Sequence, residues 1–239
     1  MIFLSENDIK SVVTMNDVID AVDEAYEIYE ANEFEMPLRT TVSKEDNTLM
    51  LMPCLTEQAY GTKLLTIFPE NKDFPVIQGV VVLNDSRTGE IKAILEGSFV
   101  TGIRTGAVGG SAVRHLAKES ASKLAIIGTG VQGLYQAAAA CSQRPISEIY
   151  LYNRSPNKIP AFINKLQEWV GDQVQIHASP TVEDAVANTD IVITATRSMD
   201  PVLPNDKALL EDKLIIGVGS YQPTMQEFSQ AVYELVENI

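Results

Sequence analysis

Three glycines in the second half of the chain have a spacing that could hold a phosphate group. The loop of Gly128, Thr129, Gly130, Val131, Gln132 and Gly133 directly follows the apolar run 124–127 and opens an Ala-rich stretch. In a strand–loop–helix unit, the first glycine permits a tight turn, the second lets a pyrophosphate approach the backbone, and the third lets helix and strand pack closely. The helix start adds N–H donors and a partial positive charge. The spacing therefore predicts a dinucleotide site; a purely structural glycine turn is the alternative.

The residues expected to contact the adenine ribose include no acid. Asn153, Arg154 and Ser155 end the next predicted strand, and Asn153 lies 20 positions after Gly133. An Asp or Glu here would bond the ribose hydroxyls and repel a 2′-phosphate, whereas Arg154 can pair with a phosphate through two hydrogen bonds. We therefore expect NADP(H) to be preferred, with NAD(H) possible. The alternative is that Arg154 is only a solvated loop cation.

Two further predicted strand ends are built from small residues. Thr194, Ala195 and Thr196 end one strand, and Gly219 and Ser220 follow another. Ligands of open α/β sheets bind outside the carboxyl ends of the strands. We therefore expect these residues to contact the nicotinamide half of the cofactor, with ordinary loop sequence as the alternative for any one of them.

Three cations in the first half of the chain have apolar or small neighbours. Arg39 lies in a predicted strand, 38–42; Lys63 opens the strand that continues to residue 67; Arg104 lies in a helix rich in small residues, 98–116. Cations in such surroundings often face a cleft or an anionic ligand. A surface cation with a buried aliphatic stem is the alternative for each.

The elements that position these residues follow two different patterns. Residues 1–118 predict an α+β domain, in which Ser5 and Thr14 cap helices and the strands are 38–42, 49–55, 61–67 and a hairpin over 80–95. Residues 119–239 predict a Rossmann-type, doubly wound parallel sheet with helices on both faces. Its strands are expected at 124–127, 149–152, 174–177, 190–194 and 214–218, its helices at 131–141, 159–170, 181–187 and 206–210, and a last β-like run at 231–236. Because such a sheet rarely stops abruptly, we expect a further C-terminal segment.

The composition excludes several classes of function. The 18 basic and 32 acidic residues give a net charge of −14, which repels phosphate backbones and argues against nucleic acid. No apolar run approaches the ~20 residues of a membrane span, and the N-terminus has no basic region before an apolar stretch, so we expect a cytoplasmic protein. Cys54 and Cys141 are isolated, and His115 and His177 suggest structural roles, so no metal site is predicted.

The chain resembles the ornithine cyclodeaminase/μ-crystallin family, which includes archaeal alanine dehydrogenases and ketimine reductases. The resemblance runs from near the N-terminus to Phe228. It rests on the loop with Gln132 together with the segments 36–40, 51–53, 61–63, 88–89, 102–107, 153–155, 194–196 and 219–227. It implies that Arg39, Lys63 and Arg104 surround the substrate carboxylate and the reacting α-carbon, that Thr105 contacts the cofactor, and that the protein is a homodimer acting on a small amino or imino acid.

The proton chemistry follows from this implied arrangement. Two guanidinium groups can hold a carboxylate near the nicotinamide. Lys63 beside two permanent cations should have a lowered pKa, so it could act as an acid toward an imine or as a base toward an amine.

One position departs from the cyclodeaminase pattern. Cyclodeaminases of the family have an Asp two residues before the proline that matches Pro223, and here that residue is Tyr221. A phenol is a poor substitute for a carboxylate that must hold an ammonium group. We therefore expect imino-acid reduction or amino-acid oxidation. Ornithine cyclodeamination and non-catalytic NADP(H) binding remain alternatives.

Overall fold

The computed structural model describes residues 1–236 and contains two compact units, Met1–Arg104 and Thr105–Ile239. The division falls inside the long helix α3 (Gly97–Leu116), whereas the sequence places the domain boundary just after that helix, at 118/119. Residues 237–239 of the expected second domain lie outside the described part of the chain.

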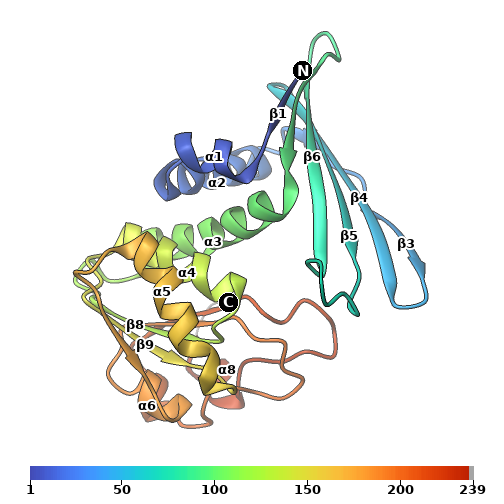
Figure 1. Cartoon of the computed structure of the whole chain (residues 1–239). Helices are drawn as coiled ribbons and strands as arrows, with labels where there is room; N and C mark the ends of the chain where they lie inside the picture. The colour runs from blue at the N-terminus through green and yellow to red at the C-terminus, as the bar shows by residue number, and fades with distance from the viewer. Residues whose placement is uncertain (237–239) are drawn as a thin grey trace. The chain divides into compact units, whose positions relative to one another are not determined.

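The first unit is built on one mixed sheet (Figure 1). Its strand order is β1-β7-β6-β5-β4-β2, with β3 also paired to β4. All pairs are antiparallel except β1 with β7, which are parallel. The strands are β1 (Ile2–Leu4), β2 (Phe34–Glu35), β3 (Thr40–Lys44), β4 (Asn47–Thr56), β5 (Ala59–Ile67), β6 (Ile77–Asp85) and β7 (Ile91–Glu96).

Two helices precede most of this sheet, and both begin at the predicted caps. Ser5 starts α1 (Glu6–Val12) and Thr14 starts α2 (Met15–Glu30). In each case the cap hydroxyl accepts an N–H bond from the acid three residues later, and that acid accepts one in return. These reciprocal bonds satisfy N–H groups that a helix start leaves free, and they confirm the predicted starts.

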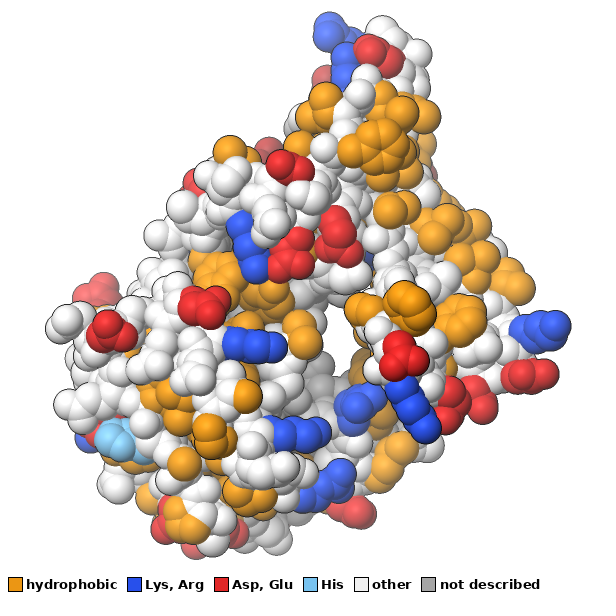
Figure 2. All heavy atoms as spheres, in the orientation of Figure 1, with side chains coloured by type: hydrophobic (Ala, Val, Ile, Leu, Met, Phe, Trp, Pro, Cys, Tyr) orange, Lys and Arg blue, Asp and Glu red, His pale blue; other side chains and the backbone are white. Residues whose placement is uncertain are grey.

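The two faces of the first sheet differ in burial. On β5, Leu65 is buried together with Ile19 of α2 and Phe99 of α3, whereas its neighbour Leu64 is 39% exposed. Successive side chains of a strand point to opposite faces, so one face carries the helices and the other is open. Figure 2 shows hydrophobic side chains gathered over the strands of this sheet.

The second unit contains a five-stranded, fully parallel sheet in the order β10-β9-β8-β11-β12. This is the strand order of a dinucleotide-binding sheet through its fifth strand, and it confirms the predicted Rossmann-type fold. The strands are β8 (Lys123–Ile127), β9 (Glu148–Tyr152), β10 (Gln175–Ala178), β11 (Ile191–Thr194) and β12 (Leu214–Gly217). The helices are α4 (Val131–Gln143), η1 (Pro156–Lys158), α5 (Ile159–Val170), α6 (Val182–Val186), α7 (Lys207–Leu210) and α8 (Gln230–Leu235).

Both faces of this sheet are covered (Figure 1). On β8, Leu124 and Ile126 belong to the core shared with α4 and α5, whereas Ala125 and Ile127 belong to the core shared with α6, α7 and α8. All four are at most 1% exposed. Burial on both faces explains why this strand reads as an uninterrupted apolar run.

Three expectations about the elements were wrong, and two short strands, β1 and β2, were not predicted. The run 231–236 is not β-like, because Ala231 and Val232 are buried on helix α8 and the N–H of Ala231 donates to Asn205 Oδ1 at its start. Arg39 precedes β3 instead of lying in a strand, and Lys63 lies inside β5 instead of opening a strand.

Candidate functional site

The glycine loop of the second unit has the geometry that its spacing predicts. Gly128 has a φ of +110°, which favours glycine, and a Cβ there would lie 2.6 Å from the Ala195 carbonyl oxygen. A Cβ on Gly133 would overlap the Gly128 carbonyl oxygen. The Gly128 N–H donates to the Tyr152 carbonyl at 2.9 Å, which ties the loop to the neighbouring strand β9. The first and third glycines are therefore required by the packing of the loop.

The middle of this loop is suited to an anionic group. Gly130 is the N-cap of α4, no side chain caps that helix, and its first turn contains no acid. A Cβ on Gly130 would meet nothing within 4 Å, and Val131 is 66% exposed. Free N–H groups and the helix dipole at such a start attract phosphate. A dinucleotide pyrophosphate therefore fits this position.

Buried polar atoms in and beside the loop also favour a bound cofactor. Thr129 Oγ1, Gln132 Oε1 and Thr194 Oγ1 are buried and have no hydrogen-bond partner among the described residues. Buried polar groups in proteins are normally paired. These three lie in the loop or at the end of β11, where a bound cofactor would add hydrogen-bonding atoms.

The residues expected to contact the ribose lie beside the loop. Asn153 Oδ1 accepts from the Thr129 N–H at 3.4 Å, and its Nδ2 donates to the Ser155 carbonyl at 2.9 Å. The Asn153 side chain therefore joins the β9 end to the glycine loop. Arg154 is exposed, and no ion pair of the described residues involves it.

The ends of β11 and β12 are held together by a residue that the sequence reasoning did not assign to the site. Glu227 is 3% exposed, and its carboxylate accepts from Thr196 N and Oγ1 at 2.6 and 2.7 Å and from Gly219 N at 2.6 Å. In the sequence, Glu227 belongs to the segment 219–227 that carries the family resemblance, but its position before the apolar Phe228 does not distinguish it from a surface acid.

Small residues on α3 allow close packing within the second unit. A Cβ on Gly106 would lie 2.7 Å from the Tyr135 carbonyl oxygen, and one on Gly109 would overlap the Gln136 side chain. Gln136 Nε2 donates to the Thr105 carbonyl at 2.7 Å. Gly106 and Gly109 therefore allow close contact between α3 and α4.

The three predicted substrate cations belong to the first unit and interact electrostatically. Burial lowers the pKa of Lys63, and the positive charges of Arg104 and Arg39 lower it further. Burial also lowers the pKa of Arg104, followed by the charge of Arg39, while Tyr26 opposes the shift. The expected direction for Lys63 is therefore confirmed, but its largest single cause is burial, ahead of either neighbouring charge.

This cation cluster, defined as Arg39, Lys63 and Arg104, has no acidic partner in the part of the chain that the structure describes. Among the described residues, no ion pair involves any of the three, although the chain carries a net charge of −14. Lys63 is half-buried, while Arg39 and Arg104 remain accessible to solvent. An accessible group of uncompensated cations is suited to bind a small anion such as a carboxylate.

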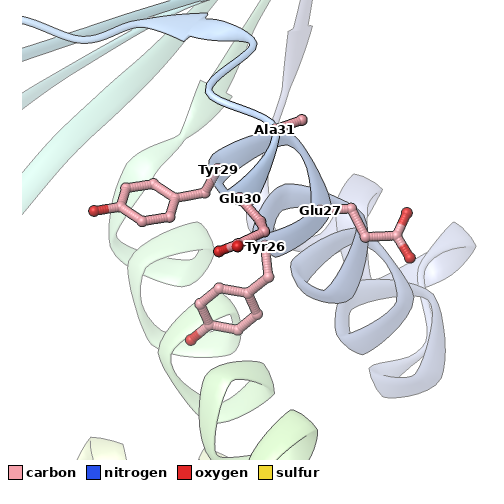
Figure 3. A pocket seen from close by; sticks show the side chains of 5 residues that line it. All are labelled: Tyr26, Glu27, Tyr29, Glu30 and Ala31. Carbon is pink, nitrogen blue, oxygen red and sulfur yellow. The ribbon is translucent and has the colours of Figure 1, made fainter.

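A shallow hollow on α2 has the opposite chemistry (Figure 3). It has a volume of about 620 Å³ and is lined by Tyr26, Glu27, Tyr29, Glu30 and Ala31. Its two carboxylates would repel a substrate carboxylate. This hollow is therefore poorly suited to bind a substrate carboxylate.

Tyr221 lies at the surface of the second unit. Its side chain is 64% exposed, and its N–H donates to the Gly219 carbonyl at 3.0 Å. The nearby buried acid, Glu227, is already occupied by three donors. Neither residue offers a free carboxylate for a substrate ammonium group.

The remaining candidate groups have other surroundings. Burial raises the pKa of the Cys141 thiol to about 12. The Nε2 atom of His177 lies 3.6 Å from Oε2 of Glu148. The described residues contain no group of three or more His, Cys, Asp or Glu placed to hold a metal ion. None of the described helices is both long enough and apolar enough to span a bilayer.

Comparisons with known proteins agree with this geometry. The model of the ornithine cyclodeaminase/mu-crystallin family matches residues 1–237. A Delta(1)-pyrroline-2-carboxylate reductase from Bacillus cereus is 39% identical over 95% of this chain and 70% of its own. The Thermococcus litoralis Delta(1)-pyrroline-2-carboxylate reductase, solved with NADH and L-proline, is 30% identical with a TM-score of 0.86 over 96% of this chain and 72% of its own. An archaeal alanine dehydrogenase dimer with bound NAD is 26% identical with a TM-score of 0.87, covering 97% and 71%. The chain belongs to the ornithine cyclodeaminase/mu-crystallin family.

Proposed function

We propose that this protein is an NAD(P)H-dependent reductase of small imino acids, with a cyclic ketimine such as Δ1-pyrroline-2-carboxylate as its substrate and the oxidation of the matching amino acid as the reverse reaction. The observation that carries the proposal is the uncompensated cation cluster around Lys63, in a chain whose relatives include named imino-acid reductases.

The cation cluster supplies the substrate-binding groups. Arg39 and Arg104 hold the substrate carboxylate, each able to form two parallel hydrogen bonds with it. This contact fixes the α-carbon and the imine nitrogen beside it. Reduction converts C=N to CH–NH by adding a hydride to carbon and a proton to nitrogen.

Lys63 supplies the proton. Its ammonium group donates to the imine nitrogen during reduction, and its neutral amine accepts a proton during oxidation. Burial and the two neighbouring arginines lower its pKa, so its ammonium group releases a proton more readily than that of an ordinary lysine. A bound carboxylate offsets part of this effect by neutralising positive charge.

The glycine loop holds the cofactor, which supplies the hydride when bound. The free N–H groups at the start of α4 bind its pyrophosphate, and the ends of β11 and β12, with Thr194, Ala195, Thr196, Gly219 and Ser220, line its nicotinamide half. Thr105 completes the cofactor-binding set by family resemblance.

NADPH is the preferred reductant in this proposal. The β9 end offers no acid to repel a 2′-phosphate, and Arg154 is accessible and has no ion pair in the described part of the chain. We expect Arg154→Ala to weaken NADPH binding roughly 10- to 100-fold and to leave NADH binding nearly unchanged. Fluorescence titration with both nucleotides measures this, and Lys158→Ala on η1 is the control. Equal affinity of the unmodified protein for NADPH and NADH would contradict the preference.

Cyclodeamination of ornithine is the weaker candidate. It needs a carboxylate that holds the side-chain ammonium group, but Tyr221 is exposed and Glu227 is committed to backbone donors. The test is to incubate the protein with Δ1-pyrroline-2-carboxylate and NADPH, and separately with ornithine and catalytic NAD(P). We expect loss of the reduced-nicotinamide absorbance in the first case and no proline or ammonia release in the second. Ornithine turnover without ketimine reduction would reject the proposal.

We also propose that the open face of the first sheet forms a homodimer. Val80, Leu64 and Leu51 are paired across β6, β5 and β4, and Leu49 is paired to Val42 of β3. Val42, Leu64 and Val80 are 58%, 39% and 36% exposed. A continuous apolar face of this kind is typical of an interface between identical subunits.

The dimer can be tested by placing a charge on that face. We expect Leu64→Glu to convert a dimer into a monomer in sedimentation velocity, since two acids would meet near a two-fold axis. Val12→Glu, at the end of α1, is the control for adding an acid at an exposed apolar position. A monomeric unmodified protein at micromolar concentration would contradict the dimer.

A further inference from the structure

Glu227 combines three features that are unusual together. Its side chain is 3% exposed, it is ionisable, and no ion pair of the described residues involves it. Three donors converge on its two oxygens: Thr196 N and Oγ1 on Oε1, and Gly219 N on Oε2. Hydrogen bonds to a charged acceptor are roughly twice as strong as neutral ones. This carboxylate is therefore stabilised by backbone and hydroxyl groups alone.

The two segments that Glu227 joins come from different strands. Thr196 follows β11 and Gly219 follows β12, and these strands are hydrogen-bonded neighbours in which Thr194 pairs with Gly217. Beyond these paired residues the two loops approach so closely that a Cβ on Gly219 would overlap the Thr196 carbonyl oxygen. The regular ladder ends at this point, so the carboxylate fixes the relative position of the two loops where the backbone ladder no longer does.

The same residue connects to the glycine loop through Thr196. A Cβ on Gly128 would lie 2.6 Å from the Ala195 carbonyl oxygen and 3.1 Å from Thr196 Cγ2. The backbone of Glu227 is also anchored, because its carbonyl oxygen accepts hydrogen bonds from the N–H groups of Val202 and Leu203 at 2.9 and 3.2 Å. Glu227 therefore lies at the meeting point of the ends of β8, β11 and β12.

We propose that Glu227 is a positioning residue for the nicotinamide half of the cofactor site: its carboxylate holds the β11 and β12 loops in the arrangement that accepts this half. The inference rests on the proposed dinucleotide site. The adenine half depends on other contacts, namely the Gly128 bond to Tyr152 and the Asn153 bond to Thr129. Loss of Glu227 should therefore affect the two halves of the cofactor unequally.

The variant Glu227→Gln tests this with nearly unchanged size. One oxygen becomes an NH₂ group, which cannot accept from a backbone N–H, so the amide can hold only one of the two loops. Glu168→Gln on α5 is the matched control, because Glu168 is exposed and in the same unit. The probes are NADPH and its adenine half, adenosine 2′,5′-bisphosphate, or NADH and AMP if the protein prefers NADH.

We expect Glu227→Gln to raise the Kd for the whole dinucleotide roughly 10- to 100-fold and to change the Kd for the adenine half by less than about 2-fold. Unchanged binding of both probes would overturn the inference, and so would equal weakening of both, which would indicate general damage to the unit. If circular dichroism shows that this variant does not fold, Glu227→Asp replaces it, because it keeps the charge on a shorter side chain. We again expect the Kd for the whole dinucleotide to rise and the Kd for the adenine half to stay nearly unchanged. Failure of the unmodified protein to bind either probe would instead reject the dinucleotide site itself.

Discussion

The regions proposed to bind substrate and cofactor are built from different parts of the polypeptide. In the first unit, three long cationic side chains come from a loop, a strand and a helix, and no acid among the described residues forms an ion pair with them. In the second unit, the glycine loop is shaped by backbone geometry, and Gly130, the position proposed to face the cofactor, has no side chain. The first region therefore depends on the identity of charged groups, and the second depends on the absence of side-chain atoms.

The comparison also shows two ways of handling buried charge. Lys63 is half-buried beside two like charges, and burial first and then those charges lower its pKa, as its proposed role in proton transfer requires. Glu227 is surrounded by hydrogen-bond donors that satisfy its carboxylate. The first arrangement favours reactivity, whereas the second favours a fixed geometry.

The largest expected effect is on proton transfer in the first region. Lys63→Met keeps much of the side-chain volume and removes the transferable proton, so we expect kcat for ketimine reduction to fall roughly 10²- to 10⁴-fold. NADPH affinity should stay unchanged. Lys92→Met is the control, since Lys92 is exposed and paired with Glu90. A Lys63 variant that keeps a tenth of the activity would exclude Lys63 as the proton donor.

A smaller effect is expected for Arg39, which precedes β3 and is proposed to bind the substrate carboxylate. Arg39→Ala removes one charge-assisted contact, so we expect kcat/KM to fall roughly 10- to 100-fold, mainly through KM. Arg87→Ala, in the turn between β6 and β7, tests for a general effect of charge. If Arg39→Ala and Arg87→Ala have the same kinetics, Arg39 does not bind the substrate.

Substitutions at two glycines of the second region should have different effects on cofactor binding and on stability. Gly130→Ala has open space for its methyl group, so we expect the free energy of unfolding to change by less than about 1 kcal/mol, while NADPH binding falls because the methyl group faces the pyrophosphate. Gly133→Ala overlaps the Gly128 carbonyl and should cost about 1–3 kcal/mol of stability. Urea unfolding and NADPH titration measure the two quantities. Equal loss of stability in both variants would contradict the expected difference between open space at Gly130 and steric overlap at Gly133.

The pH dependence of reduction should report the lowered pKa of Lys63. The donor must be protonated, so kcat/KM falls as the pH rises through this pKa, below the ordinary lysine value of ~10.4. Arg39→Ala removes one cause of the shift and should move this alkaline limb to higher pH. A limb that stays in place in the variant would show that another group titrates.

The smallest expected effect concerns stability. The charged form of Lys63 is disfavoured in the folded state, so the folded pKa lies below the unfolded one. The penalty is complete below the folded pKa and disappears above the unfolded pKa. We therefore expect Lys63→Met to raise the free energy of unfolding at neutral pH by about 0.5–1 kcal/mol, and by less at alkaline pH. Urea unfolding at the two pH values checks this, and a loss of stability at neutral pH would contradict it.

Local sequence determined much of this protein. The capping residues Ser5 and Thr14 predicted two helix starts, and the alternation of apolar runs with helical patterns predicted the parallel sheet. The glycine spacing predicted a tight turn at Gly128, and this residue has a positive φ in the structure. These features rest on interactions between residues close in the sequence, which is why the sequence alone could reveal them.

Tertiary structure decided the features that depend on residues far apart in the chain. The run 231–236 could satisfy a strand or a helix pattern, and packing against the second sheet selected helix α8. Burial of Lys63, the largest single cause of its pKa shift, depends on elements that its neighbours in sequence do not reveal. Glu227 looks like a surface acid until the ends of β11 and β12 bring Thr196 and Gly219 to it. An acid takes its role from the donors around it, and those donors come from strands that only the folded sheet places together.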